Sequence, residues 1–462
     1  MLIGRKKEIE RLNEYLGSNR SEFIALLGRR RIGKTYLIRQ TFNNSIFFEF
    51  TGQKNISNKE ELKQFAKNIN EKQIINNWNE AFDILKDKII QVNQIKKKII
   101  FFDEISWICK QKSNFISALA YFWNDFCSRR NDVLLIICGS AISWIIDNIL
   151  ENRDELHNRL TGQIFLSPLN LKECEDYFNY LQINYSRYDI VETYMILGGI
   201  PYYLDYFRKG LSVAENIDEI IFRKKAPLQN EYNELFNSLF KNSEQYKIII
   251  ETLADNYNGL TQTELARKLR IVKNGNFVKK LRDLEMCGFL IKQTPFNKKK
   301  KDTVFQLIDS FSVFYLTFIK DKNPLNEFYW QSKTNSPSIA VWRGYAFERV
   351  CFLHINQIKK ALNIYGVLSN ASSFRDEESQ IDLVIQREDR IINLCEIKFT
   401  KDIFEIDKDY YEKLRKRLNH FENMLKTKRT VHLTMITSFG LQFNKYSSII
   451  NSKLTMENLF LD

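Results

Sequence analysis

The sequence predicts an α/β fold built around a parallel sheet, and three apolar runs carry this prediction. Residues 23–27, 99–102 and 133–138 read FIALL, IIFF and VLLIIC, and each run ends in glycine, hydroxyl or carboxyl residues. Strands of a parallel sheet are covered on both faces and are therefore continuously apolar, and their carboxyl ends gather ligands at one edge. Segments with helical periodicity separate the runs, as in repeated strand-helix-strand units. We therefore expect a ligand site where these runs end.

Length and composition limit the classes of protein to which this chain can belong. The chain has 462 residues, which is too long for one hydrophobic core and suggests about three domains. No apolar run approaches the roughly 18 residues of a membrane span, and the N-terminal MLIGRKKEIE lacks the apolar segment of a secretion signal. The seven cysteines include no C-x-x-C pair, which argues against a zinc knuckle or a disulfide framework. We expect a cytoplasmic protein with reduced cysteines and no membrane partner.

The charge balance is basic. Sixty-nine basic and 56 acidic residues give a net charge of +13 and a pI of about 9.1. Such an excess favours a polyanionic partner, and DNA is the partner expected here. A chain rich in lysine, asparagine and isoleucine reaches the same charge without binding nucleic acid, so charge alone leaves the partner open.

Residues 23–35, FIALLGRRRIGKT, contain the first chemical motif. Gly28, Gly33, Lys34 and Thr35 match G-x-x-x-x-G-K-[ST], a loop whose backbone N–H groups surround a phosphate chain. We expect Lys34 to neutralise the β- and γ-phosphates of ATP, Thr35 to bind Mg²⁺, and the helix starting near Gly33 to add positive potential. The nucleotide-binding residues predicted from this loop are Gly28, Arg29, Arg30, Arg31, Ile32, Gly33, Lys34, Thr35 and Tyr36, with ATP and Mg as cofactors.

Elements of the same α/β type flank the loop. Ile9, Leu12, Tyr15 and Leu16 recur at helical spacing and predict a helix before the first strand. After the loop, residues 45–51 (SIFFEFT) read as a strand and residues 59–92 as amphipathic helices.

The second motif is IIFFDE at residues 99–104, an apolar strand that ends in two carboxylates. Asp103 is expected to hold Mg²⁺ together with Thr35, and Glu104 to orient and deprotonate the attacking water. An apolar run followed by Asp-Glu is a weak signal by itself, because many strands end in this way. Its place downstream of the phosphate loop makes a catalytic function the favoured interpretation.

The third run, VLLIICGS at residues 133–140, ends in Ser140. This serine lies where a hydroxyl would contact the γ-phosphate or the water, although it could equally be an ordinary turn residue. A further strand is expected at residues 162–166.

Residues 168–206 read as helices interrupted by GGIPYY at residues 198–203. Taken in order, an N-terminal apolar-Gly-Arg segment, GRRRIGKT, FFDE, CGS, LHNRL and GGIPYYL resemble the archaeal-type ATPase family, which is close to the AAA, STAND and Orc-like P-loop ATPases. The resemblance covers the whole chain. It implies a helical lid over the nucleotide, with Gly4 and Arg5 lining the adenine pocket and Pro201 contacting adenine.

The same resemblance implies an arginine that acts in trans. Proteins of the AAA type carry such a residue before the last strand of the sheet, which makes Arg159 the choice over Arg129 and Arg130. A homo-oligomer would then complete the site. Surface arginines are common, so a solvated Arg159 is the alternative.

Residues 245–302 predict a winged helix-turn-helix. Three helical segments are followed by two short strands, and Thr261 with Glu264 forms a capping-box signature for the second helix. Residues 276–280 (NFVKK) would be the recognition segment, and Lys298 to Lys301 would form a basic wing. The same motif is also used for protein contacts.

The C-terminal region carries a second chemical constellation. A helix at residues 342–353 contains Glu348, a strand at 380–386 contains Asp382, and a strand at 391–399 contains Glu396 and Lys398 on one face. Two carboxylates and a lysine around one point suit Mg²⁺-dependent phosphodiester cleavage, with Asp382 and Glu396 as metal ligands. The order E, D, E-x-K resembles the restriction-endonuclease-like superfamily, although such a strand is more often a solvated face.

The fold class predicted is therefore α/β: a P-loop NTPase parallel sheet with a helical lid, then a winged-helix domain and a small restriction-endonuclease-like α/β domain. The expected function is a DNA-associated ATPase with a metal-dependent nuclease site. The alternative is a nucleotide-driven signalling or assembly switch whose C-terminal domains bind without cleaving. The predicted divisions are 1–166 for the ATPase core, 167–238 for the lid, 239–320 for the winged helix, 321–340 for a linker and 341–462 for the nuclease-like domain.

Overall fold

The computed structural model describes residues 2–92, 97–110, 113–150, 156, 158–321, 326–425 and 429–462. The chain divides into two compact units. The first comprises Met1–Pro168 with Asn237–Lys241, and the second comprises Leu169–Phe236 with Asn242–Asp462. The finer division of the second unit into lid, winged helix and nuclease-like domain stays a prediction.

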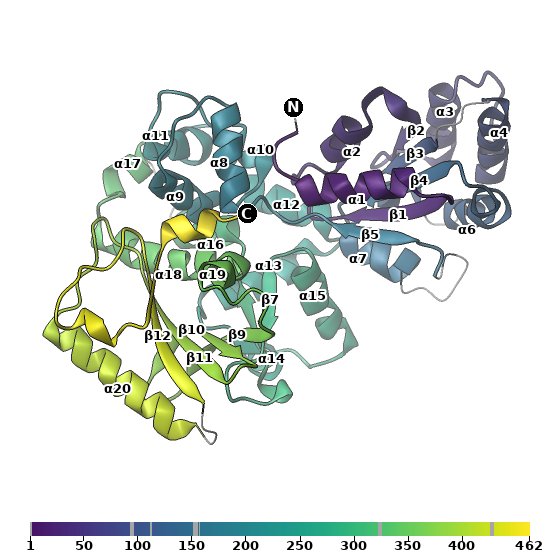
Figure 1. Ribbon diagram of the computed structural model, residues 1–462. Coiled ribbons are helices and arrows are strands. Elements are labelled where there is room, and N and C mark those ends of the chain that lie inside the picture. The colour runs from purple at the N-terminus through teal and green to yellow at the C-terminus, as the bar shows by residue number, and fades with distance from the viewer. Residues whose placement is uncertain are drawn as a thin grey trace. The chain divides into compact units, whose positions relative to one another are not determined.

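The first unit contains the predicted parallel sheet (Figure 1). Its strand order is β2-β3-β4-β1-β5, and every neighbouring pair is parallel. Leu27 pairs with Gly139 and Phe102 pairs with Ile137, so β1, β4 and β3 end at one edge. The elements are α1 (Lys6–Gly17), β1 (Glu22–Leu27), α2 (Lys34–Phe42), β2 (Ile46–Thr51), α3 (Asn58–Asn68), α4 (Trp78–Gln91), β3 (Lys98–Asp103), α5 (Ile105–Ile108), α6 (Phe115–Tyr121), β4 (Val133–Gly139), α7 (Ile142–Ile145) and β5 (Gly162–Phe165).

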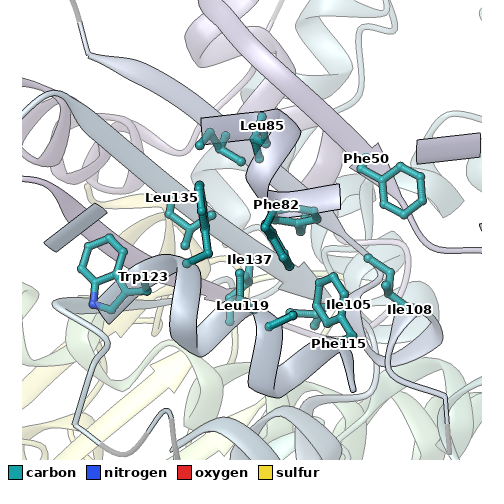
Figure 2. Close-up of a cluster of buried hydrophobic side chains, with 14 of the residues drawn as sticks. Phe50, Phe82, Leu85, Ile105, Ile108, Phe115, Leu119, Trp123, Leu135 and Ile137 are labelled. Atoms are coloured by element: carbon teal, nitrogen blue, oxygen red, sulfur yellow. The ribbon is translucent and has the colours of Figure 1, made fainter. Parts of the chain in front are cut away.

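An aromatic core packs against one face of this sheet (Figure 2). Phe82 lies in its centre, with ring centroids 5.9 Å from Phe102 of β3 and 5.7 Å from Phe115 of α6. Each fully buried side chain of this size contributes about 1.5–3 kcal/mol to folding. The core therefore stabilises the position of β3, whose last residue is Asp103.

Two stretches of the second unit, one at its start and one after β8 (Val304–Leu307), consist of helices. They are α8 (Leu171–Tyr180), α9 (Arg187–Leu197), α10 (Pro201–Leu204), α11 (Val213–Ile217), α12 (Glu231–Leu239, which crosses the unit boundary), α16 (Ser310–Phe318), α17 (Tyr329–Lys333), α18 (Pro337–Leu353) and α19 (Ile355–Ala361).

The segment predicted as a linker, residues 321–340, differs from that prediction in the part that the structure describes. It contains α17 and the first turn of α18. The Trp330 side chain is fully buried, and buried Asp218 accepts hydrogen bonds from the Trp330 and Gln331 N–H groups at 2.8 and 3.0 Å. Prolines and polar residues predicted a linker here, whereas the burial of Trp330 and the hydrogen bonds to Asp218 hold the described part of this segment against the rest of the unit.

The three helices and two strands predicted for the winged helix are present, and a short third strand, Leu260–Thr261, was not predicted. They are α13 (Ser243–Ala254), β6 (Leu260–Thr261), α14 (Gln262–Leu269), α15 (Gly275–Met286), β7 (Leu290–Gln293) and β8 (Val304–Leu307), and the strands form an antiparallel sheet in the order β6-β8-β7. The predicted capping box forms at the start of α14, where the Glu264 N–H donates to the Thr261 hydroxyl at 3.2 Å.

The C-terminal sheet has the order β13-β12-β11-β10-β9. Its elements are β9 (Ser369–Arg375), β10 (Gln380–Arg387), β11 (Ile391–Lys398), α20 (Lys408–Met424), β12 (Thr430–Thr437) and β13 (Ser452–Thr455). Strands β9, β10 and β11 pair antiparallel, and β11, β12 and β13 pair parallel. Helix α20 lies along this sheet (Figure 1), and its Leu414 and Phe421 share a core with Leu394 of β11.

That core also includes Phe296, from the β7–β8 connection. The Phe296 ring centroid lies 5.1 Å from that of Phe421, and its N–H donates to the Ser373 carbonyl at 2.9 Å. The segment predicted as a wing is therefore joined to the C-terminal sheet through a shared hydrophobic core.

No helix among the described residues is long and apolar enough to cross a membrane.

A buried histidine links two helical segments of the second unit. His354 lies between α18 and α19 with 1% of its surface exposed, and its Nε2 accepts a hydrogen bond from the Leu171 N–H at 3.0 Å. Its Nδ1 lies 2.8 Å from the Val350 carbonyl, to which it donates. Burial lowers the pKa of His354 to about 4.

We predict that this histidine destabilises the protein in mild acid. As the pH falls from about 6.5 towards about 4, the unfolded chain takes up a proton that folded His354 does not, so the free energy of unfolding decreases by up to about 1.4 kcal/mol per pH unit. In His354→Gln this contribution is lost, and its melting temperature should fall less than that of the wild type between pH 7.5 and pH 5. Circular dichroism melts measure this, with half-exposed His432→Gln as the control. Parallel decreases in wild type and His354→Gln would contradict the prediction.

Candidate functional site

The loop between β1 and α2 has the backbone that its glycines predict. Gly28 has φ 155°, and a Cβ there would lie 2.4 Å from the Ile32 side chain and 2.7 Å from the Leu166 carbonyl oxygen. Gly33 precedes α2 with φ 87°, in the left-handed region. Only glycine meets both demands without strain, because it has no Cβ.

Lys34 lies inside this loop. Its side chain is buried, and its Nζ donates to the Gly28 and Arg29 carbonyls at 2.8 and 2.9 Å. Its ammonium group therefore lies within the loop, against the Gly28 and Arg29 backbone. The predicted neighbours differ in exposure: Arg29 and Ile32 are buried, Arg30 and Arg31 are half-buried, and Tyr36 is exposed on α2.

Arg5, in the N-terminal segment, forms a hydrogen bond to the backbone of the loop between β1 and α2. It is buried, and its Nη1 donates to the Ser167 carbonyl at 2.6 Å and its Nη2 to the Ile32 carbonyl at 3.3 Å. Both Gly4 and Arg5 have positive φ, at 68° and 63°. The guanidinium thus holds the phosphate loop by its backbone. The expected adenine contact of Gly4 and Arg5 stays a prediction.

Thr35 and Asp103 meet at the edge where the strands end. The Thr35 Oγ1 donates to Asp103 Oδ2 at 2.6 Å, and the Glu104 N–H donates to Asp103 Oδ1 at 2.9 Å. Asp103 is buried. A hydroxyl and a carboxylate are suitable oxygen ligands for Mg²⁺, which proteins usually hold through one or two carboxylates with substrate phosphates and water. The two predicted magnesium ligands of the first unit therefore fit the ion.

Glu104 and Ser140 also contact each other. Glu104 Oε2 accepts from the Ser140 hydroxyl at 2.9 Å and from the Ser140 N–H at 3.1 Å. Glu104 has φ 48°, a conformation that is uncommon outside glycine and asparagine. The strand β4, which ends beside β3, delivers Ser140 to this carboxylate.

The three candidate arginines have different surroundings. Arg159 is exposed in the turn that precedes β5. Arg130 makes two hydrogen bonds of 2.7 Å to Asp132, and this guanidinium, with Lys98, lowers the pKa of Asp132 to about 2. Arg129 lies 3.4 Å from Asp125. Of the three, Arg159 is the one exposed without an ion pair among the described residues.

Pro201 is the first residue of α10 in the second unit. Residues 198 and 199 must be glycine for different reasons. Gly198 ends α9 with φ 66°, and a Cβ on Gly199 would lie 1.8 Å from the Leu169 carbonyl oxygen. Gly199 therefore allows the backbone before α10 to approach the segment that precedes α8. The adenine contact expected of Pro201 stays a prediction.

In the second unit, Asp382 and Glu396 lie on neighbouring antiparallel strands. Leu383 pairs with Cys395, and the same register places Asp382 opposite Glu396. Asp382 Oδ2 accepts from the Ile397 N–H at 3.2 Å. Burial, and then the charges of Glu396 and Glu348, raise the pKa of Asp382 to about 8.

Glu396 is the most heavily bonded member of this group. Burial alone would raise its pKa, but Lys398, Arg417 and Tyr410 together hold that pKa below its ordinary value. Its carboxylate lies 2.9 Å from Lys398 Nζ, accepts from the Tyr410 hydroxyl at 2.7 Å and accepts from Arg417 Nη1 at 2.8 Å. Glu396 and Lys398 are thus brought together as predicted.

Sequence reasoning missed Tyr410 and Arg417. They are seven residues apart in α20, so they lie on the same helix face, as do Leu414 and Phe421 of the core. A tyrosine and an arginine within the apolar stripe of this helix were the available signal.

Glu348 comes from α18, and its partner was also missed. The Tyr257 hydroxyl donates to Glu348 Oε2, and the Tyr257 ring lies 4.3 Å from that of Tyr345. Burial raises the pKa of Glu348. Tyr257 lies in the connection between α13 and β6, so residues far apart in sequence complete this region.

Among the described residues, no group of three or more His, Cys, Asp or Glu side chains is arranged to hold a metal ion. The pair Asp382 and Glu396 is compatible with magnesium by donor chemistry, because Mg²⁺ is commonly held by one or two carboxylates together with water. The metal site in this unit stays a prediction.

Comparisons with known proteins match the first part of the chain to a family. Residues 2–207 match the model of an ATPase domain predominantly from Archaea. The uncharacterized protein MJECL04 of Methanocaldococcus jannaschii is 26% identical over 423 residues, which cover 89% of this chain and 92% of that protein.

Two solved structures are similar to part of this chain at low identity. The Walker-type ATPase PABY2304 of Pyrococcus abyssi is 18% identical with a TM-score of 0.48, and the match covers 69% of this chain and 96% of that one. The ORC2 protein of Aeropyrum pernix, determined in ADPNP and ADP complexes, is 14% identical with a TM-score of 0.42, over 72% of this chain and 96% of that one.

Proposed function

We propose that the protein hydrolyses MgATP through residues 2–207, which match the model of an ATPase domain predominantly from Archaea, and that it does so in association with DNA. The observation that carries the catalytic part is the contact between Thr35 and Asp103, with Glu104 and Ser140 bonded to each other beside it. These four side chains come from the ends of β3 and β4 and the start of α2.

Each residue has a separate role in this proposal. Lys34 and the loop N–H groups bind the β- and γ-phosphates, while Thr35 and Asp103 hold Mg²⁺. The ion supplies charge neutralisation for the phosphates when bound. Glu104 orients the attacking water and accepts its proton, and Ser140 holds the Glu104 carboxylate in position.

We predict that Glu104→Gln and Lys34→Ala separate turnover from binding. Glu104→Gln keeps the shape and the bond to Ser140 but removes the base, so ATP binding should persist while kcat falls at least about 100-fold. Lys34→Ala should lose ATP binding, because the phosphates lose their cation. Fluorescent nucleotide titration and phosphate release measure the two effects. Turnover that persists in Glu104→Gln would remove the base assignment.

We propose further that Arg159 acts on the ATP of a second copy. It is exposed, whereas Arg130 and Arg129 are engaged with aspartates. Arg159→Ala should bind ATP normally and hydrolyse it more slowly, and wild-type specific activity should rise with protein concentration. Arg129→Ala is the matched control. Specific activity that does not depend on concentration, in a protein that remains monomeric with ATP, would identify Arg159 as a solvated residue.

The DNA part of the proposal rests on the second unit. The elements from α13 to β8 occur in the order predicted for a winged helix, and Lys298 to Lys301 are exposed in the β7–β8 connection. The C-terminal sheet groups Asp382, Glu396 and Lys398, which supports a metal-dependent cleavage site for phosphodiesters.

One observation favours the alternative, a signalling or assembly switch that binds protein. Ile271 and Val272, just before the predicted recognition segment at the start of α15, are 45% and 78% exposed. Apolar side chains do not bind phosphates, and clusters of them suit protein contacts. Salt-sensitive binding of the full chain to DNA would support the DNA-associated ATPase. Absence of DNA binding at low salt would support the signalling or assembly switch.

We predict that metal-dependent cleavage of DNA requires Asp382 and Lys398. With Mg²⁺ or Mn²⁺, the full chain should nick supercoiled DNA, and Asp382→Asn and Lys398→Met should each abolish nicking while DNA binding persists. Asp389→Asn, in the exposed turn after β10, is the matched control and should nick as the wild type does. Nicking that survives in Asp382→Asn would show that this cluster is not the cleavage site.

A further inference from the structure

A cleft in the second unit lies beside the Asp382 cluster. Its volume is about 470 Å³, and its walls come from the β7–β8 hairpin and its connection, helix α18 and strands β9 and β10. Glu348 and Asp382 both line it. A cavity of this size can admit one nucleotide unit of an extended strand, whereas a duplex is too wide to enter it.

The cleft contains a buried cation with spare hydrogen-bonding capacity. Arg349 lines it with 6% of its surface exposed, and no described residue accepts a hydrogen bond from its Nη2. Its neighbour on α18, Glu348, is occupied by the Tyr257 hydroxyl. A buried guanidinium with an unmet donor is costly to the folded chain, and such groups are rare in native structures.

The other charged residues of the cleft are of both signs. Lys298 and Arg375 are exposed cations at its walls, and the carboxylates are Glu264, Asp302, Glu348 and Asp382. Because the lining has three cations and four carboxylates, any attraction for an anion is local to Arg349, whose buried charge is poorly screened by solvent. A guanidinium forms two parallel hydrogen bonds with a phosphate, which suits a phosphodiester.

We propose that Arg349 binds a backbone phosphate of a single nucleic-acid strand in this cleft, with Lys298 and Arg375 contacting the strand as it enters. The proposal rests on the proposed nucleic-acid function and deepens it by naming the substrate class: a single strand, such as an end or an unpaired segment, is held beside Asp382. Arg349 is thus a strand-positioning residue.

The test uses the full chain in EDTA, so that no metal-dependent cleavage takes part. The probes are a fluorescein-labelled dT 20-mer and a labelled 20-base-pair duplex, and binding is followed by anisotropy over a range of salt. Arg349→Met should weaken binding of the single strand at least about tenfold and lower its salt slope by about 0.7. Duplex binding should change less than twofold. Arg415→Met, an exposed arginine on α20, is the matched control and should bind both probes as the wild type does.

Stability distinguishes binding from a structural role. Replacing an unpaired buried charge by an apolar side chain of similar length should leave the melting temperature unchanged or raise it. Arg349→Lys keeps the charge but not the paired donors, so it should bind the single strand with intermediate affinity.

Three results would overturn the proposal: single-strand affinity within twofold of wild type in Arg349→Met, equal losses for the single strand and the duplex, or a lowered melting temperature in Arg349→Met. These results are separable from failure of the cleavage function. If Arg349→Met weakens single-strand binding in EDTA but the protein does not nick DNA in Mg²⁺ or Mn²⁺, the cleft binds a strand and the protein is not a nuclease. If the protein nicks DNA but Arg349→Met binds the single strand as the wild type does, the protein is a nuclease and Arg349 does not bind the strand.

Discussion

The parallel pairing of β1, β4 and β3 is the constraint on which the ATPase site depends. Because Leu27 pairs with Gly139 and Phe102 with Ile137, the phosphate loop, Ser140, Asp103 and Glu104 all follow strands that end at the same edge. Hydrogen bonds then connect Thr35 to Asp103 and Ser140 to Glu104. The aromatic core behind the sheet restrains β3, so a change in that core would displace Asp103 and Glu104.

The second unit buries several charged side chains, and their partners determine how each is stabilised. Glu396 is surrounded by Lys398, Arg417 and the Tyr410 hydroxyl, and these partners keep it ionised in a buried position. Asp382 has only the Ile397 N–H as a hydrogen-bond partner among the described residues, and burial raises its pKa to about 8. The pKa values of two carboxylates on adjacent strands are therefore shifted in opposite directions because their surroundings differ.

Packing also joins segments that the sequence separates. Phe296, from the β7–β8 connection, enters the core formed by α20 and the C-terminal sheet, and Tyr257 reaches Glu348 on α18. The hairpin is thus fixed beside the sheet, and the cleft that Arg349 lines is a product of that docking. The β7–β8 connection held in this way places Lys298 at the wall of the cleft.

The sequence by itself determined the elements whose signals are local. The G-x-x-x-x-G-K-T loop, the three apolar strands, the Thr261 capping box and the Glu396-x-Lys398 spacing are all readable within a few residues, because each depends on backbone conformation or on the period of one element. The parallel sheet followed from the same runs. The pairing of Thr35 with Asp103 followed from the motifs, since the ends of parallel strands meet.

Only the tertiary structure decided which distant side chains complete each site. Arg417 and Tyr410 reach Glu396 because α20 packs along the sheet. Trp330 is held in a segment that reads as a linker because Asp218 accepts its N–H. Arg349 is adjacent to a predicted residue, yet nothing in the local pattern distinguishes a buried arginine with an unmet donor from an exposed one. The physical reason is that burial and partner choice depend on contacts between elements far apart in the chain, whereas motif and periodicity report only on neighbours.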